Sequence, residues 1–356
     1  MLVVGCGLVT ERLHLPVLAG LRDVIDVIGF VDPDEGRREL CAAAVPHAAT
    51  YADLDVALRA AAPEEVLVAT PAGLHRDQTL AALAAGAHVL CEKPLAVTSD
   101  DCVTMIAAAE AAGRVLGVGL MRRFLPSVNA IASLLREGVL GAPRTFTVLE
   151  GVPFGWPVTS DHPFRRGRGG GVIYDAGPHL LDILQCWFGE LELVDYADDA
   201  MGGVEANCLM TLAAAGGVTG TVRMSRDVLL PNRHVIECER GWVAYHYDVA
   251  DRFYWGWHGS PTANTVHLAA PGSTRPMWDY PDPNRAVSAR LSAAFEAQHR
   301  NVAAAIRGSG ELVVTPREAA AGIALLERCH RERRLLDMAW MDPAELAQAA
   351  RLEVGA

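Results

Sequence analysis

The sequence predicts an α/β chain in which a parallel sheet covered on both faces is followed by an α+β region with a large, mostly antiparallel open sheet. Short apolar runs alternate with alanine-rich helical segments in the first third, and these runs are too apolar to have one face in water. After about residue 122 the pattern changes to β segments joined by glycine turns. Because 356 residues also exceed the usual size of a single core, we expect two domains, 1–122 and 123–356.

The first domain is expected to open with a βαβ unit. Residues 1–21, MLVVGCGLVTERLHLPVLAGL, pass from a β-branched run through glycines into a helical pattern, and residues 24–34, VIDVIGFVDPD, supply a second strand that ends in acid. Apolar runs predict further strands at 64–71, 88–94 and 114–120, separated by helical patterns at 76–87 and 99–113.

The second domain is expected to consist mainly of β segments. They lie at 143–152, 208–225 and 234–247, with helices at 179–189 and 317–336. Residues 250–285 are rich in Trp, Tyr, Pro and Gly and have no clear period, so they predict an insertion or a long loop.

The composition argues against several classes of protein. A net charge of −12 without any run of Lys or Arg disfavours a nucleic-acid partner. Eight cysteines form no CxxC pair and no dense framework, which favours reduced thiols over disulfides or a zinc site. The sequence has neither a charged leader nor an apolar run of membrane length. We therefore expect a soluble, cytoplasmic protein with no membrane partner and no bound metal.

The first strand ends in a glycine turn. Gly5 and Gly7 in GCGLVT stand where a tight turn and a close pyrophosphate both exclude a side chain. The third position of GxGxxG is Thr10, so the turn alone is a weak signal. Asp32 lies 22 residues past Thr10, at the end of the second strand, where a carboxylate would bind ribose hydroxyls and repel a 2′-phosphate. Together these residues predict an N-terminal Rossmann dinucleotide-binding domain that takes NAD.

Two alternatives stay open at this site. Asp32 is also a typical turn acid before Pro33. Arg37 and Arg38 are close enough in sequence to keep NADP as an alternative cofactor.

Lys93 is the only lysine among 31 basic residues, and all the others are arginine. A lysine in a partly desolvated pocket loses its proton readily and presents a compact ammonium, whereas an arginine stays protonated. Bias toward arginine codons would explain the scarcity of lysine. The surviving one lies in Glu-Lys-Pro, at the carboxyl end of a predicted parallel strand, where open α/β sheets bind ligands. This position predicts a functional lysine.

Three segments resemble the marks of the glucose–fructose oxidoreductase/inositol dehydrogenase (Gfo/Idh/MocA) family. They are VATPAGLH at 68–75, CEKPLA at 91–96 and GGGVIYDAGPHLLD at 169–182, and their order along the chain fits the family. The resemblance covers most of the chain and fades between about 250 and 290. It implies that the catalytic group is Lys93, Asp175 and His179. The cofactor-binding residues, including those of the glycine turn, are then Gly5, Gly7, Leu8, Asp32, Thr70, Pro71, His75, Glu92 and Lys93.

The sequence departs from the family pattern at two positions. Thr10 replaces the usual small third residue of the turn, which bears on cofactor affinity or preference. Met121 stands where many members carry an aromatic residue before Arg-Arg, which bears on the substrate pocket.

Hydride exchange between a secondary alcohol and NAD needs a group that removes the hydroxyl proton, with a pKa near neutrality. The ordinary pKa of a histidine side chain is already near neutrality. Asp175 lies four residues before His179 near the start of a predicted helix, so the carboxylate can orient the imidazole. The plainer interpretation is that Asp175 is an N-cap and His179 an ordinary first-turn residue.

Other chemistry-bearing residues have more ordinary interpretations. Arg165, Arg166 and Arg168 precede three glycines and are expected in a solvated loop, with contact to an acidic substrate as the alternative. Arg122 and Arg123 are expected to brace the domain junction. Sheet packing is the favoured role of five aromatic residues that could otherwise form a sugar-stacking wall, namely Tyr245, Tyr247, Tyr254, Trp255 and Trp257.

The expected activity is an NAD(P)-dependent oxidoreductase acting on a secondary alcohol or ketone of a sugar, cyclitol or related polyol. A homodimer or homotetramer is expected to form through the open sheet. One alternative is a keto-sugar or amino-sugar reductase or dehydrogenase in a biosynthetic pathway. Another is a non-catalytic dinucleotide-sensing regulatory protein, which the retention of Lys93, Asp175 and His179 disfavours.

Overall fold

The computed structural model describes residues 1–155, 157–158, 161–246, 252–260, 262–267, 289–337, 342–345 and 347. The chain divides into two compact units. The first comprises Met1–Phe124 and Asn284–Ile323, and the second comprises Leu125–Pro283 and Ala324–Ala356. The first division falls within two residues of the expected 122. Residues 284–323 group with the first unit, whereas the expected second domain ran unbroken from 123 to 356.

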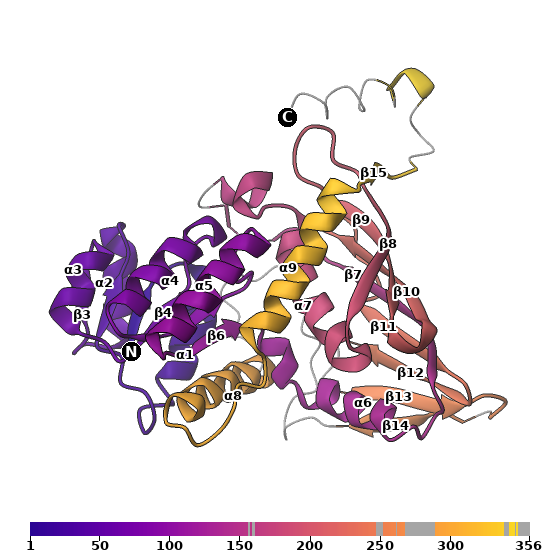
Figure 1. The fold of residues 1–356 in the computed structure, drawn as a ribbon, viewed down its shortest axis with the longest axis horizontal. Coiled ribbons are helices and arrows are strands. Elements are labelled where there is room, and N and C mark those ends of the chain that lie inside the picture. Colours follow the sequence, from indigo (N-terminus) through magenta and orange to yellow (C-terminus); the bar gives the residue numbers. More distant parts are fainter. Residues whose placement is uncertain are drawn as a thin grey trace. The chain divides into compact units, whose positions relative to one another are not determined.

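The first unit contains a six-stranded parallel sheet (Figure 1). Its strand order is β3-β2-β1-β4-β5-β6, with the order reversing between β1 and β4. Every residue of β1, β2, β4, β5 and β6 is buried, as expected for strands covered on both faces. The strands are β1 (Leu2–Val4), β2 (Gly29–Val31), β3 (Ala49–Tyr51), β4 (Glu65–Val68), β5 (His88–Glu92) and β6 (Leu116–Gly119). The predicted α/β first domain is confirmed.

Helices connect these strands, and the sequence marks where several begin. Asp34, Asp53 and Thr98 each accept a backbone N–H three residues later, which caps the helices α2, α3 and α5. A π-helix, η1, follows the glycine turn. The helical elements of this unit are η1 (Thr10–His14), α1 (Leu15–Leu18), α2 (Glu35–Ala44), α3 (Leu54–Ala61), η2 (Ala72–Leu74), α4 (His75–Ala84), α5 (Ser99–Ala112), η3 (Met121–Phe124) and α8 (Ala289–Ile306).

The second unit contains a nine-stranded mixed sheet with the order β14-β13-β12-β11-β7-β10-β9-β8-β15. Among the described strands of this sheet, only the pairs β7–β10 and β8–β15 are parallel. The predicted mostly antiparallel sheet is therefore confirmed. The strands are β7 (Pro143–Gly151), β8 (Leu191–Asp198), β9 (Asn207–Ala214), β10 (Val218–Ser225), β11 (Arg233–Cys238), β12 (Gly241–His246), β13 (Arg252–Trp257), β14 (Asn264–His267) and β15 (Arg334–Leu335).

The helix α7 packs against β8, β9 and β10, and against α6. Along β10, Val222 and Met224 are buried while Arg223 between them is exposed, so one face of the sheet forms the core. The helical elements of this unit are α6 (Pro126–Arg136), η4 (His162–Phe164), η5 (Arg166–Arg168), α7 (Val172–Phe188) and η6 (Ala215–Gly217). The division between the units falls inside α9 (Pro316–Arg331). Within the described residues, no helix combines the length and apolarity needed to cross a membrane.

The segment expected as a loop at 250–285 contains two strands, which corrects that expectation. β13, with the sequence RFYWGW, pairs antiparallel with β12, and β14 pairs with β13. Aromatic residues favour strands and here extend the edge of the sheet, although they show no alternation with polar residues. Much of the remaining segment lies outside the described residues.

Glu65 at the start of β4 is 6% exposed, and its Oε1 has no hydrogen-bond partner among the described residues. Burial raises the pKa of Glu65 from 4.5 to about 7. Between pH 4.5 and about pH 7, Glu65 keeps its proton in the folded protein but has lost it in the unfolded chain. The free energy of unfolding therefore falls as pH rises through this range, by up to about 3 kcal/mol.

We predict that Glu65→Gln removes this pH-dependent fall in the free energy of unfolding, because the amide does not ionise. The variant's melting temperature should exceed that of the unmodified protein at pH 8, and the gap should shrink at pH 5. Glu64→Gln is the matched control because Glu64 is the exposed neighbour. An equal difference in melting temperature at both pH values would contradict the raised pKa of Glu65.

Candidate active site

The sequence-predicted residues of the first unit gather at one edge of its sheet. Gly5 follows β1, Asp32 follows β2, Thr70 lies just beyond β4, and Lys93 follows β5. All these strands are parallel, so their carboxyl ends share an edge. The order reverses between β1 and β4, and such switch points are where open α/β sheets bind their ligands.

The glycine turn fits a pyrophosphate. Gly5 has a φ of +95°, and a Cβ there would lie 2.5 Å from the carbonyl oxygen of Ala69. A Cβ on Gly7 would meet nothing within 4 Å, so this side of the turn is open to a ligand. The buried Thr10 hydroxyl donates to the Gly5 carbonyl at 2.6 Å. Thr10, at the third position of GxGxxG, thus stabilises the turn through this hydrogen bond. Leu8, also in the turn, is half-buried.

Asp32 is joined to the glycine turn through its carboxylate. Its Oδ2 accepts the N–H of Cys6 at 2.8 Å, and its Oδ1 accepts the N–H of Asp34 at 2.9 Å. Both nearby arginines have partners: Arg37 pairs with Glu11 at 2.8 Å, and Arg38 donates to the Asp32 carbonyl at 2.6 Å. The carboxylate therefore stands at the sheet edge with neighbouring guanidinium groups bound to protein oxygens.

We predict that Asp32→Ala narrows the preference for NADH over NADPH. A 2′-phosphate beside a carboxylate meets repulsion and loses hydration, and the alanine variant removes both penalties. Fluorescence titration of both cofactors measures the ratio of dissociation constants. Asp34→Ala is the control because it removes a nearby carboxylate that caps α2. Tighter binding of NADPH than NADH by the unmodified protein would contradict this role of Asp32.

His75 links the loops that follow β4 and β5. Its Nδ1 lies 2.8 Å from the Pro94 carbonyl oxygen and its Nε2 lies 2.8 Å from that of Thr70. Burial lowers the pKa of this imidazole, and the two carbonyls only partly oppose the shift. Pro71, in the loop that follows β4, is exposed. The implied contacts of Pro71 and His75 with a cofactor stay predictions, and a buried His75 would act through the loops it holds.

Glu92 ends β5 and Lys93 follows it, and the two side chains have different environments. The carboxylate of Glu92 is buried: Oε1 lies 3.0 Å from His14 Nε2, and Oε2 accepts the Lys93 backbone N–H at 3.0 Å. Burial raises the pKa of Glu92, but the His14 hydrogen bond and the nearby Lys93 charge outweigh it and hold that pKa below its usual range. Lys93 is half-buried. The implied contact of Glu92 with a nicotinamide ribose stays a prediction.

The second unit carries the other predicted catalytic residues on α7. Gly171 precedes this helix with a φ of +96°, and a Cβ there would lie 2.1 Å from Glu205 Oε1. That oxygen accepts the Ile173 N–H at 3.0 Å, and the Glu205 carbonyl accepts the Val172 N–H at 3.1 Å. A buried residue from a distant segment therefore caps α7, and the glycine run makes room for it.

Asp175 lies in the first turn of α7 and is paired with Arg226, which follows β10. Arg226 Nε donates to Asp175 Oδ2 at 2.7 Å, and the guanidinium is largely shielded from solvent. His179 lies one turn further along and is 8% exposed. The expected orientation of His179 by Asp175 stays a prediction.

Four residues that the sequence reasoning did not single out take part in these arrangements: His14, Glu205, Arg226 and His299. Arg226 pairs with a carboxylate 51 positions away, and His14 meets His299 across 285 positions. No motif or period marks them. The only local signal is that Arg226 immediately follows a predicted strand, which is true of many arginines.

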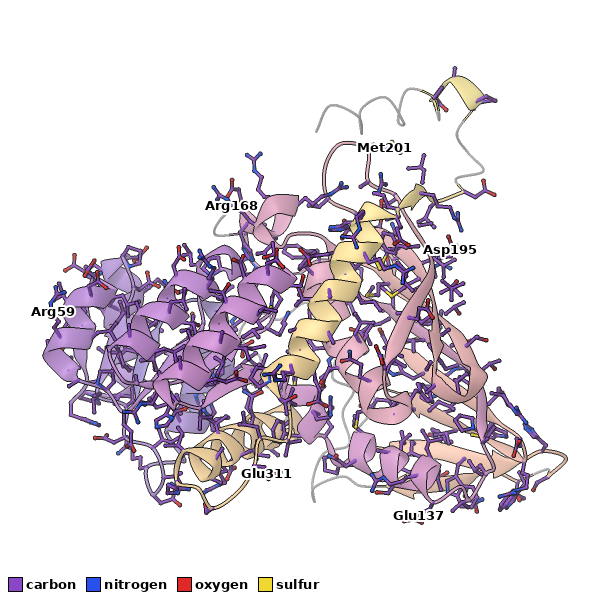
Figure 2. The ribbon with its side chains drawn as sticks, in the orientation of Figure 1. Arg59, Glu137, Arg168, Asp195, Met201 and Glu311 are labelled. Atoms are coloured by element: carbon purple, nitrogen blue, oxygen red, sulfur yellow. The ribbon has the colours of Figure 1, made fainter. Side chains whose placement is uncertain are left out.

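The other residues considered above behave mostly as ordinary structure. Arg165 and Arg168 pair with Asp161 on exposed 3-10 turns, and Figure 2 labels Arg168. Within the first unit, Arg123 pairs with Glu318 at 3.3 Å. Tyr245 is buried and packs edge-on against Trp187 and His234, whereas Tyr247 lies outside the described residues.

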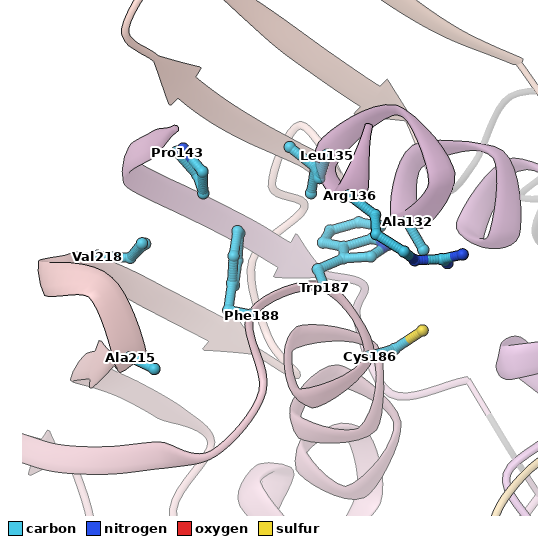
Figure 3. Close-up of a pocket in the computed structure, with 9 residues that line it drawn as sticks. All are labelled: Ala132, Leu135, Arg136, Pro143, Cys186, Trp187, Phe188, Ala215 and Val218. Carbon is cyan, nitrogen blue, oxygen red and sulfur yellow. The ribbon is translucent and has the colours of Figure 1, made fainter. Parts of the chain in front are cut away.

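A pocket of about 340 Å³ opens at the carboxyl end of α7, between that helix, α6 and the sheet (Figure 3). It is lined by Ala132, Leu135, Arg136, Pro143, Cys186, Trp187, Phe188, Ala215 and Val218. None of these is a predicted site residue. The pocket lies at the opposite end of α7 from Asp175 and His179, so it is separate from the candidate site.

Two family models match this chain, one in each unit. Residues 1–120 match the model described as the oxidoreductase family with an NAD-binding Rossmann fold, and residues 128–244 match the GFO/IDH/MocA C-terminal domain. The chain belongs to the Gfo/Idh/MocA family. The resemblance inferred from its three sequence segments is thereby confirmed. This Gfo/Idh/MocA chain has an NAD-binding Rossmann domain as its first unit.

Individual relatives of this Gfo/Idh/MocA protein act on sugars. It is 36% identical over 173 residues to 1,5-anhydro-D-fructose reductase of Ensifer adhaerens, covering 47% of this chain and 48% of that protein. It is 30% identical over 227 residues to D-apiose dehydrogenase of Paraburkholderia graminis, covering 63% and 59%. The alignments thus span about half the length of these curated relatives.

A solved structure has a similar fold. A 3-ketoreductase from Actinomadura kijaniata, in complex with NADP and TDP-benzene, superposes with a TM-score of 0.78 at 20% identity, covering 94% of this chain and 97% of that one. This likeness supports the fold of both units.

Proposed function

We propose that this protein is an NAD-dependent oxidoreductase that exchanges a hydride between nicotinamide and a secondary alcohol or ketone of a sugar, cyclitol or related polyol. The observation that carries the proposal is the placing of the only lysine, Lys93, one residue past β5. It stands at the same sheet edge as Gly5, Gly7 and Asp32. The sugar-active relatives and the family assignment support the substrate class.

The preference for NAD over NADP rests on charge. The Asp32 carboxylate faces the edge of the dinucleotide turn, and the two nearby guanidinium groups are held by Glu11 and by backbone carbonyls. A 2′-phosphate would meet the carboxylate without a ready cation. When bound, the nicotinamide supplies or accepts the hydride.

Lys93 and His179 have separate roles in this proposal. The Lys93 ammonium is compact, with rotatable donors that steady the substrate oxygen as it gains negative charge. The His179 imidazole takes or returns the hydroxyl proton. Asp175, fixed by Arg226 at 2.7 Å, supplies the negative charge that favours an imidazolium near it.

The test is a panel of sugars, cyclitols and keto-sugars assayed with NAD, NADH, NADP and NADPH, followed by nicotinamide absorbance. We expect turnover with at least one polyol or its ketone, and faster with the non-phosphorylated cofactor. Absence of any absorbance change across the panel, in a protein that still binds NADH, would favour a dinucleotide-sensing protein instead.

We further propose a cytoplasmic homodimer or homotetramer that pairs through the open face of the second unit's sheet. On that face Val194 of β8 is 60% exposed, and Thr145 of β7 and Thr219 of β10 are also exposed. All eight cysteines are free thiols, in keeping with a reducing compartment. Sedimentation equilibrium measures the assembly, and Val194→Lys should weaken it.

A further inference from the structure

Three buried side chains in the first unit form a chain of contacts that ends at Lys93. His299 Nε2 lies 3.0 Å from His14 Nδ1, and His14 Nε2 lies 3.0 Å from Glu92 Oε1. Glu92 Oε2 then accepts the Lys93 backbone N–H at 3.0 Å. The two histidines are 0% exposed and Glu92 is 7% exposed. The contacts join α8, η1 and β5, and α8 packs directly on η1 and α1.

The direction of the hydrogen bonds follows from the available partners. Burial, with the neighbouring His14, holds the pKa of His299 well below its usual value, so this ring is neutral. Its Nδ1 has no partner among the described residues, so its single proton belongs on Nε2 and is donated to His14 Nδ1. His14 Nε2 in turn donates to the Glu92 carboxylate.

The sheet leaves space for this buried carboxylate at one glycine. A Cβ on Gly119 of β6 would lie 2.8 Å from Glu92 Cδ and Oε1. The pairing of β5 with β6 aligns Glu92 with Gly119, so any side chain there would push the carboxylate from its place. The ring of His14 also packs edge-on against Phe295 at 5.0 Å between centroids, which fixes its plane.

We infer that His14 and His299 are positioning residues, which hold the Glu92 carboxylate turned into the interior so that it fixes the backbone N–H, and hence the direction, of Lys93. The inference rests on the proposed function for its catalytic meaning. Breaking the chain at His14 leaves a buried carboxylate without its donor, and Glu92 then turns toward water or takes up a proton. In the first case the Lys93 N–H loses its fixed acceptor, and in the second it keeps only a weaker, neutral acceptor. We expect the ammonium to be displaced in both cases.

The single lysine makes this displacement directly measurable. Reductive methylation with ¹³C-formaldehyde labels only Lys93 and the chain's amino group, so one side-chain signal reports the surroundings of Lys93 by NMR. We expect His14→Phe, which keeps a ring against Phe295, to move this signal toward its position in the unfolded protein. His14→Gln retains an N–H that can reach Glu92, so we expect its signal to stay near that of the unmodified protein.

The matched control is His88→Phe. His88 stands at the opposite end of β5, where its Nδ1 accepts the Val115 N–H at 2.8 Å. This change disturbs the same strand without touching Glu92, so the Lys93 signal should not move. On unlabelled protein, His14→Phe should lower kcat about tenfold while KM and the NADH dissociation constant stay within about twofold.

The outcomes separate this inference from the proposed function. An unchanged Lys93 signal in folded His14→Phe overturns the inference, as does a His14→Gln signal equal to that of His14→Phe. If His14→Phe does not fold, His299→Leu decides, because it removes only the far donor. A shifted signal then supports the inference and an unchanged one overturns it. Lack of turnover in the unmodified protein overturns the proposed function alone, since the NMR signal does not depend on activity.

Discussion

Replacing Lys93 by arginine is expected to reduce turnover by at least about 10²-fold, although the positive charge is kept. The longer, planar guanidinium would push the substrate oxygen from its place, and a misplacement of about 1 Å at a reacting centre costs about that factor. Arginine also holds its proton at any accessible pH. The NADH dissociation constant should change by no more than a few-fold, because Gly5, Gly7 and Asp32 lie on other strands of the sheet edge.

Two further variants separate the causes. Lys93→Met removes the charge at similar length and should be as inactive as Lys93→Arg if both charge and shape are needed. Arg59→Lys, at the exposed end of α3 (Figure 2), tests whether an exchange between arginine and lysine away from the site affects turnover. Turnover should stay unchanged. Near-normal turnover in Lys93→Arg would mean that the lone lysine reflects codon drift, and another residue would then have to supply the cation.

Replacing His179 by alanine is expected to lower turnover by about 10² to 10⁴, the range that proton transfer by a side chain typically contributes. Cofactor binding should stay nearly intact, because His179 lies in the second unit and the dinucleotide turn lies in the first. Steady-state rates and NADH titration on the same preparations measure both quantities.

The control for a lost histidine in this unit is His258→Ala, since His258 is half-exposed and contacts the Cys238 carbonyl at 2.9 Å. Its turnover should match that of the unmodified protein. Asp175→Asn should also slow turnover if the carboxylate acts on His179. An unchanged rate in His179→Ala would make His179 an ordinary buried residue of α7.

Much of the first unit follows from local pattern. Wholly apolar runs predict buried parallel strands, because the covering helices leave neither face in water, and these strands lie where expected. The glycine turn and Asp32 predict a dinucleotide edge because close backbone approach excludes side chains at Gly5, where the positive φ is in fact present. β13 was missed because its aromatic residues do not alternate with polar ones.

The sequence alone determined the opening βαβ unit and the buried strands that follow it, the residue types at the sheet edge, and the isolation of Lys93 as the only lysine. Only the tertiary structure decided which groups became partners: Arg226 with Asp175, Glu205 with the start of α7, and His299 with His14. The reason is physical. Hydrophobic periodicity and turn-forming residues act over a few positions and produce a recognisable local pattern in the sequence. A hydrogen bond between residues distant in the sequence needs only one donor and one acceptor, brought together by packing, and leaves no pattern in either stretch of sequence.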